Sequence, residues 1–321
     1  HDHFGESLPV FLSQDIGPDG LLERENATVL NAALRGVASE VTRALVDVVA
    51  EEGLDVSTFF AQNDGTLMSL DYAVRYPVLT IGSGPANSIR GAAFLSGAKN
   101  AIVVDVGGTT SDLGVLVDGF PRESTLPRDI GGVRTNFRMP DILSLGIGGG
   151  TVIYPRTGAV GPRSVGYRIA EEALLFGGST PTLTDAAAAA GHGIPGRSLP
   201  ALSSTQRDLL ARALEHAHER IEEAVERLSL GRVDLPLVVV GGGALLVPDD
   251  LPGAGDVLRP DRADVANAVG AAISLAGGRA EQISDADDRD AAIAAASEAA
   301  IAKAIQAGAD PLAVEIVDVL E

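Results

Sequence analysis

The sequence predicts an α/β protein whose sheets are mixed rather than wholly parallel. Segments with apolar residues at helical spacing alternate along the chain with short runs of β-branched and other apolar residues. Two of these runs, within residues 57–69 and 100–120, are followed by a tight turn and a second run. Neighbouring parallel strands need a long crossover, so each strand–turn–strand unit indicates a sheet with strands in both directions.

In the first hundred residues we expect a short strand, a long amphipathic helix, a strand followed by a turn, and a strand that continues into a helix. These elements correspond to residues 8–13, 28–49, 57–69 and 76–97. The long helix follows from its apolar spacing and ends near Gly53. The last helix begins near Pro85, because a proline in the first helical turn loses no intrahelical hydrogen bond.

The rest of the chain repeats this alternation. After the unit at 100–120 we expect a glycine-rich segment at 141–153, helices from Thr184 and over 205–231, a buried strand within 236–250, Ala-rich helices within 261–278 and 287–311, and a last strand over 313–321. The helix at 205–231 is the clearest, since its apolar and charged residues occupy opposite faces. His216 and His218 point in different directions on it, and we expect both at the surface.

Composition excludes several classes of function. The chain has 321 residues, 45% of them hydrophobic, which is enough for two cores. Its 44 acidic against 24 basic residues give a formal net charge of −20, which argues against nucleic acid and membranes as partners. Without cysteine, a disulfide, a thiolate zinc site and a thiol nucleophile are excluded. No apolar run approaches the roughly 20 residues of a membrane span, and we expect a cytoplasmic protein.

The stretch "IVVDVGGTTSD" at residues 102–112 is the strongest functional signal. Its polar and glycine positions are, in chain order, Asp105, Gly107, Gly108, Thr109, Thr110, Ser111 and Asp112. A P-loop and a dinucleotide-binding loop are both followed by a helix, whereas the alternating residues 113–120 predict a second strand. The predicted site is therefore a hairpin tip whose backbone N–H groups converge on a phosphate, with Asp105 holding Mg²⁺ or its water shell. The alternative is a plain hairpin whose glycines only make the bend, but a bend alone does not need two acids and two threonines.

Five motifs in register resemble the hydantoinase/oxoprolinase family: "SGPANSIRGA", "VVDVGGTTSD", "DILSLGIGGGT", "FGGSTPTLTDA" and "VVVGGGALLVP". The segment "LLERENATVLNAAL" resembles the family's sequence just upstream, so the resemblance covers nearly the whole chain. It implies the ribonuclease H-like fold of the actin-like ATPases, with mixed sheets flanked by helices and two lobes that close on ATP. Members of the family use ATP to activate a cyclic amide or related carbonyl compound, which they then open or carboxylate.

The resemblance implies a role for each glycine motif. It matches residues 107–110 to the second phosphate loop of such ATPases, Asp105 to Mg²⁺ and its water, and Asp112 to support of the metal or the loop. Of the other two motifs, it places the adenosine against Gly241, Gly242 and Gly243, and the nucleotide side of the cleft beside Gly148, Gly149 and Gly150. For both glycine runs an ordinary turn remains the alternative. At Ser83 and Gly84, a capped helix competes with an anion site.

Three further residues are weaker candidates for substrate contact. Asn63 and Asp64 precede a glycine, and an Asp–Gly pair alone signals only a turn. Arg24 belongs to a helix start and is a candidate for facing the cleft. The general base is not identifiable from the sequence, where Asp112 and Asp64 are the candidates.

The implied function is ATP-dependent hydrolysis of a cyclic amide of the hydantoin, N-methylhydantoin or 5-oxoproline type, through phosphoryl activation of the carbonyl. ATP and Mg²⁺ are the implied cofactors. Besides the substrate, the partners to consider are a second hydantoinase subunit and a second copy of the chain. The alternatives are a sugar or acid kinase of the same superfamily and a nonhydrolytic subunit that nucleotide switches.

Relatives in this family open with a separate lobe that has its own acidic glycine loop, and no second motif of the DxGGT type occurs in this sequence. They also continue past its last residues. We therefore expect part of a longer protein, with the tail of the first lobe and a hinge segment at 1–98 and the second lobe at 99–321. A γ-phosphate must be positioned from both lobes, so we expect the chain alone to bind ATP weakly and not to turn it over.

Overall fold

The computed structural model describes residues 9–17, 20–124, 126–232, 234–280, 289–317 and 319. They form two compact units, and the chain passes between these units four times. Unit 1 comprises residues 1–84, 123–139 and 274–321, and unit 2 comprises residues 85–122 and 140–273. The units do not coincide with the predicted division at residue 98, since residues 85–98 pack in unit 2 and 274–321 in unit 1. The assignment of the chain to two ATPase lobes stays a prediction.

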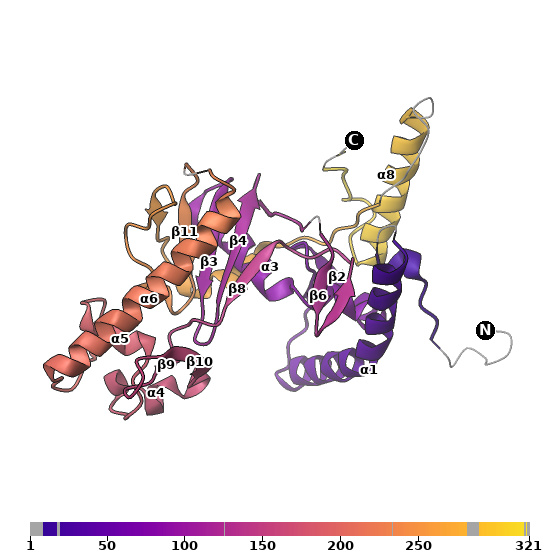
Figure 1. Ribbon diagram of the computed structural model, residues 1–321. Helices are drawn as coiled ribbons and strands as arrows, with labels where there is room; N and C mark the ends of the chain where they lie inside the picture. The colour runs from indigo at the N-terminus through magenta and orange to yellow at the C-terminus, as the bar shows by residue number, and fades with distance from the viewer. Residues whose placement is uncertain are drawn as a thin grey trace. The chain divides into compact units, whose positions relative to one another are not determined.

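Unit 2 is built on a mixed six-stranded sheet (Figure 1). Its strands are β3 (Ala101–Val106), β4 (Ser111–Val117), β5 (Phe120–Pro121), β8 (Ile142–Leu145), β11 (Leu237–Val240) and β12 (Val257–Leu258). The order is β12-β11-β3-β4-β5, and β8 pairs with β4. β11 runs parallel to β3, whereas β4 is antiparallel to β3, β5 and β8. The predicted hairpin and buried strand are thus confirmed.

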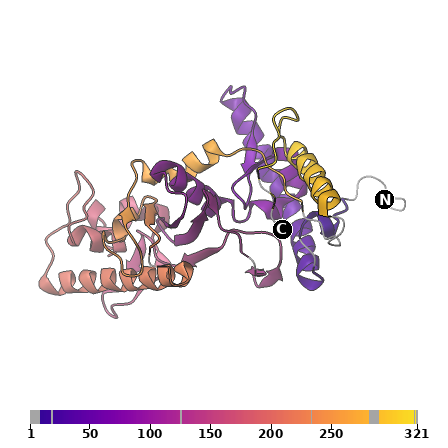
Figure 2. The same cartoon turned by 90° about the horizontal axis from the view of Figure 1, so that it is seen from above.

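Helices cover both faces of this sheet, because its central strands are apolar on both sides. One face packs on α5 (Leu183–Ala189) and α6 (Ser204–Ser229) through a core that includes Ile102, Val104 and Ile221. The other face packs on α3 (Ser83–Ser96) and α7 (Ala266–Ile273) through a core that includes Val103 and Ala266. Figures 1 and 2 show α6 lying along its face of the sheet. The site-bearing strands are therefore held from two sides.

The remaining elements of unit 2 lie between β8 and β12 in the sequence. They are β9 (Thr151–Ile153), β10 (Val160–Ser164), η3 (Gly166–Arg168), α4 (Ile169–Glu172), η4 (Leu174–Phe176), η5 (Ala244–Leu246) and η6 (Ala263–Val265). α5 begins with a capping box in which Thr182 and Asp185 satisfy each other's backbone, and Ser203 and Gln206 start α6 in the same way. These caps explain why the two predicted helices begin where they do.

Unit 1 consists of helices and two small hairpins. Its elements are η1 (Ser13–Asp15), α1 (Leu22–Glu51), β1 (Phe59–Ala61), β2 (Leu67–Ser69), α2 (Leu70–Arg75), η2 (Pro77–Thr80), β6 (Arg128–Ile130), β7 (Val133–Thr135) and α8 (Arg289–Gln306). α1 confirms the long predicted helix and extends it at both ends. In the described part of the chain, none of the helices combines the length and apolar character that a membrane crossing requires.

Three predicted strands are wrong. Within 8–13, the described residues form only the start of η1, and Phe11 packs on the apolar cluster around Ile16. The segment before α3 is the 3-10 helix η2, because Pro77 starts it and side chains take the hydrogen bonds of Val78: Asn31 accepts from its N–H at 3.4 Å and Asn63 donates to its carbonyl at 3.0 Å. Residues 313–317 are mostly exposed and form no strand. Leu8, Asp318, Leu320 and Glu321 lie outside the described residues.

Candidate functional site

The predicted hairpin tip is the turn that joins β3 to β4. The turn is closed by a hydrogen bond from the Gly107 N–H to the Thr110 carbonyl at 2.8 Å. Gly108, Thr109 and Thr110 are exposed, whereas both strands are buried over most of their length. The tip therefore presents backbone to solvent at the end of a rigid hairpin.

The segment after β8 holds the tip in place through backbone hydrogen bonds. The Gly149 N–H donates to the Gly107 carbonyl at 2.9 Å, and the Gly150 N–H donates to the Gly108 carbonyl at 2.7 Å. A Cβ on Gly148 would lie 2.6 Å from the Thr109 nitrogen, so only glycine allows this approach. Gly148, Gly149 and Gly150 are buried. The structure thus brings these predicted cofactor residues to the tip and gives them a packing role.

A second glycine segment follows β11 and reaches the same edge of the sheet. Because β11 and β3 are parallel, their carboxyl ends lie side by side, and the Gly243 N–H donates to the Val106 carbonyl at 2.7 Å. Gly241 has φ +90°, and a Cβ there would collide with the Val106 carbonyl and with Oδ1 of Asp105. Gly242 is exposed, and no atom lies within 4 Å of the position its Cβ would take.

Asp105 is the second-last residue of β3, close to the turn that forms the tip. Its side chain is half-buried, and burial raises the pKa of the carboxyl group, with Asp112 adding to the rise. The Ser88 hydroxyl donates to Oδ2 at 2.6 Å and counteracts the shift. Sequence reasoning missed Ser88, although it lies in the motif "SGPANSIRGA".

Asp112 is the register partner of Asp105 on β4. Its Oδ1 accepts a hydrogen bond from the Ser144 hydroxyl on β8, which is the neighbouring strand on the other side. The two predicted catalytic acids thus lie opposite each other on neighbouring strands, and each has one oxygen fixed by a serine. Two neighbouring carboxylates are a favourable place for a cation.

The residues at the tip fit a magnesium nucleotide. Mg²⁺ is usually held by one or two carboxylates together with waters and phosphate oxygens, and Asp105 and Asp112 supply such a pair. In the described part of the chain, no group of three or more His, Cys, Asp or Glu side chains could hold a metal by itself, so a metal here would depend on a further ligand such as a phosphate. At Gly108 the position of a Cβ is open space, which leaves the backbone accessible to an anion.

The three weaker substrate candidates belong to unit 1, whereas the residues of the tip belong to unit 2. Asn63 is 3% exposed, and its amide donates to the carbonyls of Val78 and Arg138 and accepts from the Gly82 N–H. Oδ1 of Asp64 accepts from the N–H and hydroxyl of Thr66, which is an Asx turn. The structure gives both residues structural roles, and their contact with substrate stays a prediction.

Arg24, the third of these candidates, is half-buried in the first turn of α1. Its contact with substrate also stays a prediction.

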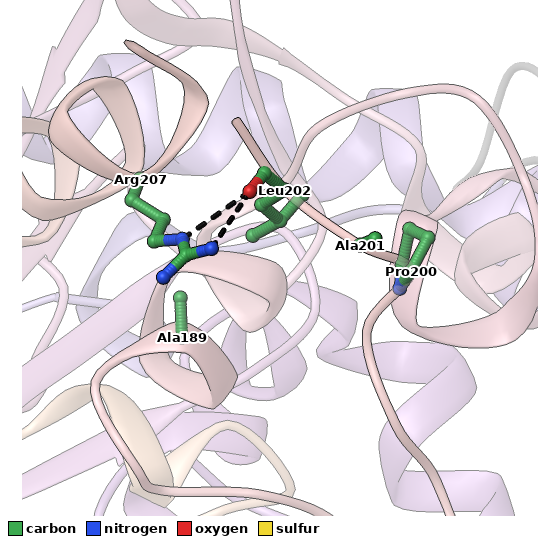
Figure 3. A pocket seen from close by; sticks show the side chains of 5 residues that line it. All are labelled: Ala189, Pro200, Ala201, Leu202 and Arg207. Carbon is green, nitrogen blue, oxygen red and sulfur yellow. Dashed lines mark hydrogen bonds between the residues drawn. The ribbon is translucent and has the colours of Figure 1, made fainter. Parts of the chain in front are cut away.

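Two cavities in the described part of the chain do not include the tip. One, of about 290 Å³, is lined by Ala189, Pro200, Ala201, Leu202 and Arg207 (Figure 3). Arg207 donates to the Leu202 carbonyl from Nε at 3.3 Å and Nη2 at 2.9 Å, so it holds the chain before α6. The other, of about 200 Å³, lies in unit 1 among apolar residues of α1, α2 and η2. Neither combines the acids and bare backbone of the tip, which remains the candidate site.

Comparisons with known proteins agree with the sequence motifs. Residues 24–240 match the hydantoinase/oxoprolinase family. The chain is 30% identical to the acetophenone carboxylase gamma subunit of Aromatoleum aromaticum over 58% of its own length and 26% of that protein. It is 29% identical to the caprolactamase subunit alpha of Pseudomonas jessenii over 66% of its length and 31% of that protein. The chain thus spans about a third or less of these two relatives.

Solved structures agree on the fold. The ATP-dependent caprolactamase of Pseudomonas jessenii superposes with a TM-score of 0.67 at 20% identity, over 92% of this chain and 49% of that one. Nucleotide-free acetone carboxylase superposes with a TM-score of 0.61 at 20% identity, over 95% of this chain and 50% of that one. The predicted α/β fold, with its mixed sheet flanked by helices, is confirmed and is shared with these two proteins.

Proposed function

Because the chain belongs to the hydantoinase/oxoprolinase family, we propose that it is the nucleotide-binding part of an ATP-dependent enzyme that opens a cyclic amide. The substrate class is a hydantoin, an N-methylhydantoin or a 5-oxoproline type ring. Support comes from the similarity to the subunit of a caprolactamase, a protein named for a cyclic amide. The relatives are named as alpha and gamma subunits, so we include a second subunit as a partner in the proposal.

One observation carries the nucleotide site: two chain segments far apart in sequence converge on the exposed tip of the β3–β4 hairpin. The segments 148–150 and 241–243 both donate backbone hydrogen bonds to it or to the end of β3. Such support fixes the tip before a ligand arrives, and a preorganised set of backbone donors is what stabilises charge on a phosphate. The role proposed for Gly108, Thr109 and Thr110 is therefore phosphate binding, while Gly107 closes the tip through its N–H bond to the Thr110 carbonyl.

The two acids have distinct proposed roles. Asp105 would hold Mg²⁺ or one of its waters, and Asp112 would support the metal or orient a water, as a candidate general base. Mg²⁺ would offset charge on the phosphates. When bound, ATP would supply the phosphoryl group that makes the amide carbon electrophilic enough for water to add and for the ring C–N bond to break, with the nitrogen as the leaving group. The contribution of this chain is to hold the phosphates on the hairpin tip and to place the two carboxylates beside them.

A second candidate function is a nucleotide-dependent carboxylase. It is favoured by the similarity to a subunit of acetophenone carboxylase, at an identity close to that of the caprolactamase subunit. Both functions need the same phosphate site, and they differ in the compound that is activated. Product analysis of the enzyme assembled with its partner subunit would separate them: a ring-opened acid supports the hydrolase, and a carboxylated ketone supports the carboxylase. A stable phosphorylated substrate would instead indicate a kinase.

Calorimetric titration of the chain with ATP, with and without Mg²⁺, tests the nucleotide site. We expect weak binding that Mg²⁺ strengthens, and no release of phosphate by this chain alone. If ATP did not bind at millimolar concentration under either condition, the nucleotide site would be wrong. If the chain hydrolysed ATP by itself, the proposal that further protein completes the site would be wrong instead.

A further inference from the structure

Asp105 is the end of a short chain of hydrogen bonds that begins on helix α7. The Asn267 amide Nδ2 donates to the Ser88 hydroxyl oxygen at 3.1 Å, and the Ser88 hydroxyl donates to Oδ2 of Asp105 at 2.6 Å. Ser88 is 1% exposed. Since the Asn267 amide occupies an acceptor site on the Ser88 oxygen, the single hydroxyl proton is left for the carboxylate.

The serine geometry differs from that of an ordinary serine within a helix. Ser96, on the same helix α3, donates to the carbonyl four residues earlier, that of Ala92, at 2.6 Å, which is the usual local bond. Ser88 instead donates out of its helix to a residue 17 positions away. The Ser88 hydroxyl therefore bonds to strand β3 of the sheet and not to a carbonyl of its own helix α3.

A close contact between two helices brings the donor to Ser88. A Cβ on Gly91 of α3 would collide with the Ala266 carbonyl of α7, and a Cβ on Gly270 of α7 would collide with the Asn87 carbonyl of α3. The backbones of α3 and α7 therefore approach as closely as glycine permits. This contact sets Asn267 against Ser88, one turn away from the glycine on each helix.

We propose that Ser88 and Asn267 are positioning residues that fix the carboxylate of Asp105 for a divalent cation. Ser88 takes Oδ2, and Oδ1 lies against the bare Cα of Gly241, at the edge of the sheet where the tip begins. With one oxygen anchored, the other keeps a defined direction and remains available to the cation. This inference rests on the proposed nucleotide site, to which it adds two residues that act through Asp105.

The test compares nucleotide binding with Mg²⁺ and with EDTA in matched variants of the chain. In Ser88→Ala we expect the strengthening of ATP binding by Mg²⁺ to fall about tenfold, since a hydrogen bond to a charged group is lost. In Asn267→Ala we expect a loss of about threefold, because that residue acts through Ser88. Binding in EDTA should not change in either variant. Ser96→Ala, which removes a serine hydroxyl from the same helix, should match the wild type under both conditions.

Two further variants extend the test: a double variant, and a variant that reverses the hydrogen bond between residues 267 and 88. Ser88→Ala combined with Asn267→Ala should lose no more than Ser88→Ala alone, since both act on one bond. Asn267→Asp offers the Ser88 proton a competing acceptor, and we expect it to weaken the Mg²⁺ effect more than Asn267→Ala. Melting temperatures check that each variant folds, and if Ser88→Ala does not fold, the two Asn267 variants carry the test.

Two results would overturn the inference while leaving the nucleotide site intact. One is an unchanged Mg²⁺ effect in Ser88→Ala and Asn267→Asp. The other is an equal loss of binding with Mg²⁺ and with EDTA, which would mean a purely structural role for the hydrogen-bond chain. Failure of the wild type to bind nucleotide under either condition would overturn the proposed function, and this inference with it.

Discussion

The glycines around the hairpin tip fall into two groups that look alike in the sequence. Gly148, Gly241 and Gly243, which we call the packing group, have neighbouring backbone where a Cβ would stand, so glycine at these positions is required by packing. Gly108 and Gly242, which we call the open group, have open space at the same position and no positive φ. The folded chain does not require glycine at these two positions. A ligand that approaches the backbone closely would require glycine there. The packing group therefore builds the site, whereas the open group marks the positions that contact its ligand.

The largest effect is expected from breaking the packing group. Gly241→Ala places a side chain at φ +90° and forces it against the Val106 carbonyl, which should cost about 3 kcal/mol of folding free energy. Chemical denaturation followed by circular dichroism measures this loss. The neighbouring variant Gly242→Ala should change the free energy of unfolding by less than about 0.5 kcal/mol. Equal stability of the two variants would contradict the division into groups.

The open group should respond in the opposite way. In Gly108→Ala we expect an unchanged melting temperature and a loss of Mg²⁺–ATP affinity of about tenfold or more, because the added methyl stands where phosphate oxygens approach the backbone. Calorimetric titration measures the affinity. Gly193→Ala, at an exposed glycine with equally open space, serves as the control and should bind like the wild type. Wild-type affinity in Gly108→Ala would mean that the ligand does not contact this part of the tip.

The hairpin could be predicted from the sequence because its signals are local. The apolar strand, the Gly-Gly turn and the alternating return strand lie within residues 101–117, and the structure pairs the strands in that order. The helix α6 was equally clear, since its apolar face repeats over seven turns and its start has a capping box. Where the pattern and the contacts are both local, prediction needs no knowledge of the rest of the fold.

Features that depend on distant partners were missed. The segment at Pro77 reads as a strand, but side chains from α1 and from the turn after β1 take the hydrogen bonds of Val78. The contact between Ser88 and Asp105 depends on how α3 packs on the sheet, which no spacing in the sequence reveals. The convergence of glycine segments followed from the family motifs, but the split between packing glycines and open glycines is visible only in three dimensions.

His218 is a further residue whose burial depends on contacts with residues distant in the sequence. The sequence predicts two surface histidines on α6, and His216 is exposed, but His218 is half-buried and bonds to the backbone of Leu246 in η5. η5 directly follows Gly243, so this bond ties the packing group of glycines to α6. The burial of His218 lowers its pKa, and the nearby His192 adds to the effect.

The smallest effect is expected from protonation of His218, which bonds to the backbone of Leu246. Because the folded state disfavours the charged form of His218, its contribution to stability is present above the unfolded pKa of about 6.5 and is lost as the pH falls through the folded pKa. His218→Gln keeps a donor for Leu246 without a titrating group, and should reduce the loss of stability between pH 7 and pH 5 by less than about 1 kcal/mol. His216→Gln, on the exposed face, is the control. If His218→Gln loses as much stability between pH 7 and pH 5 as the wild type and His216→Gln, protonation of His218 does not contribute to that loss.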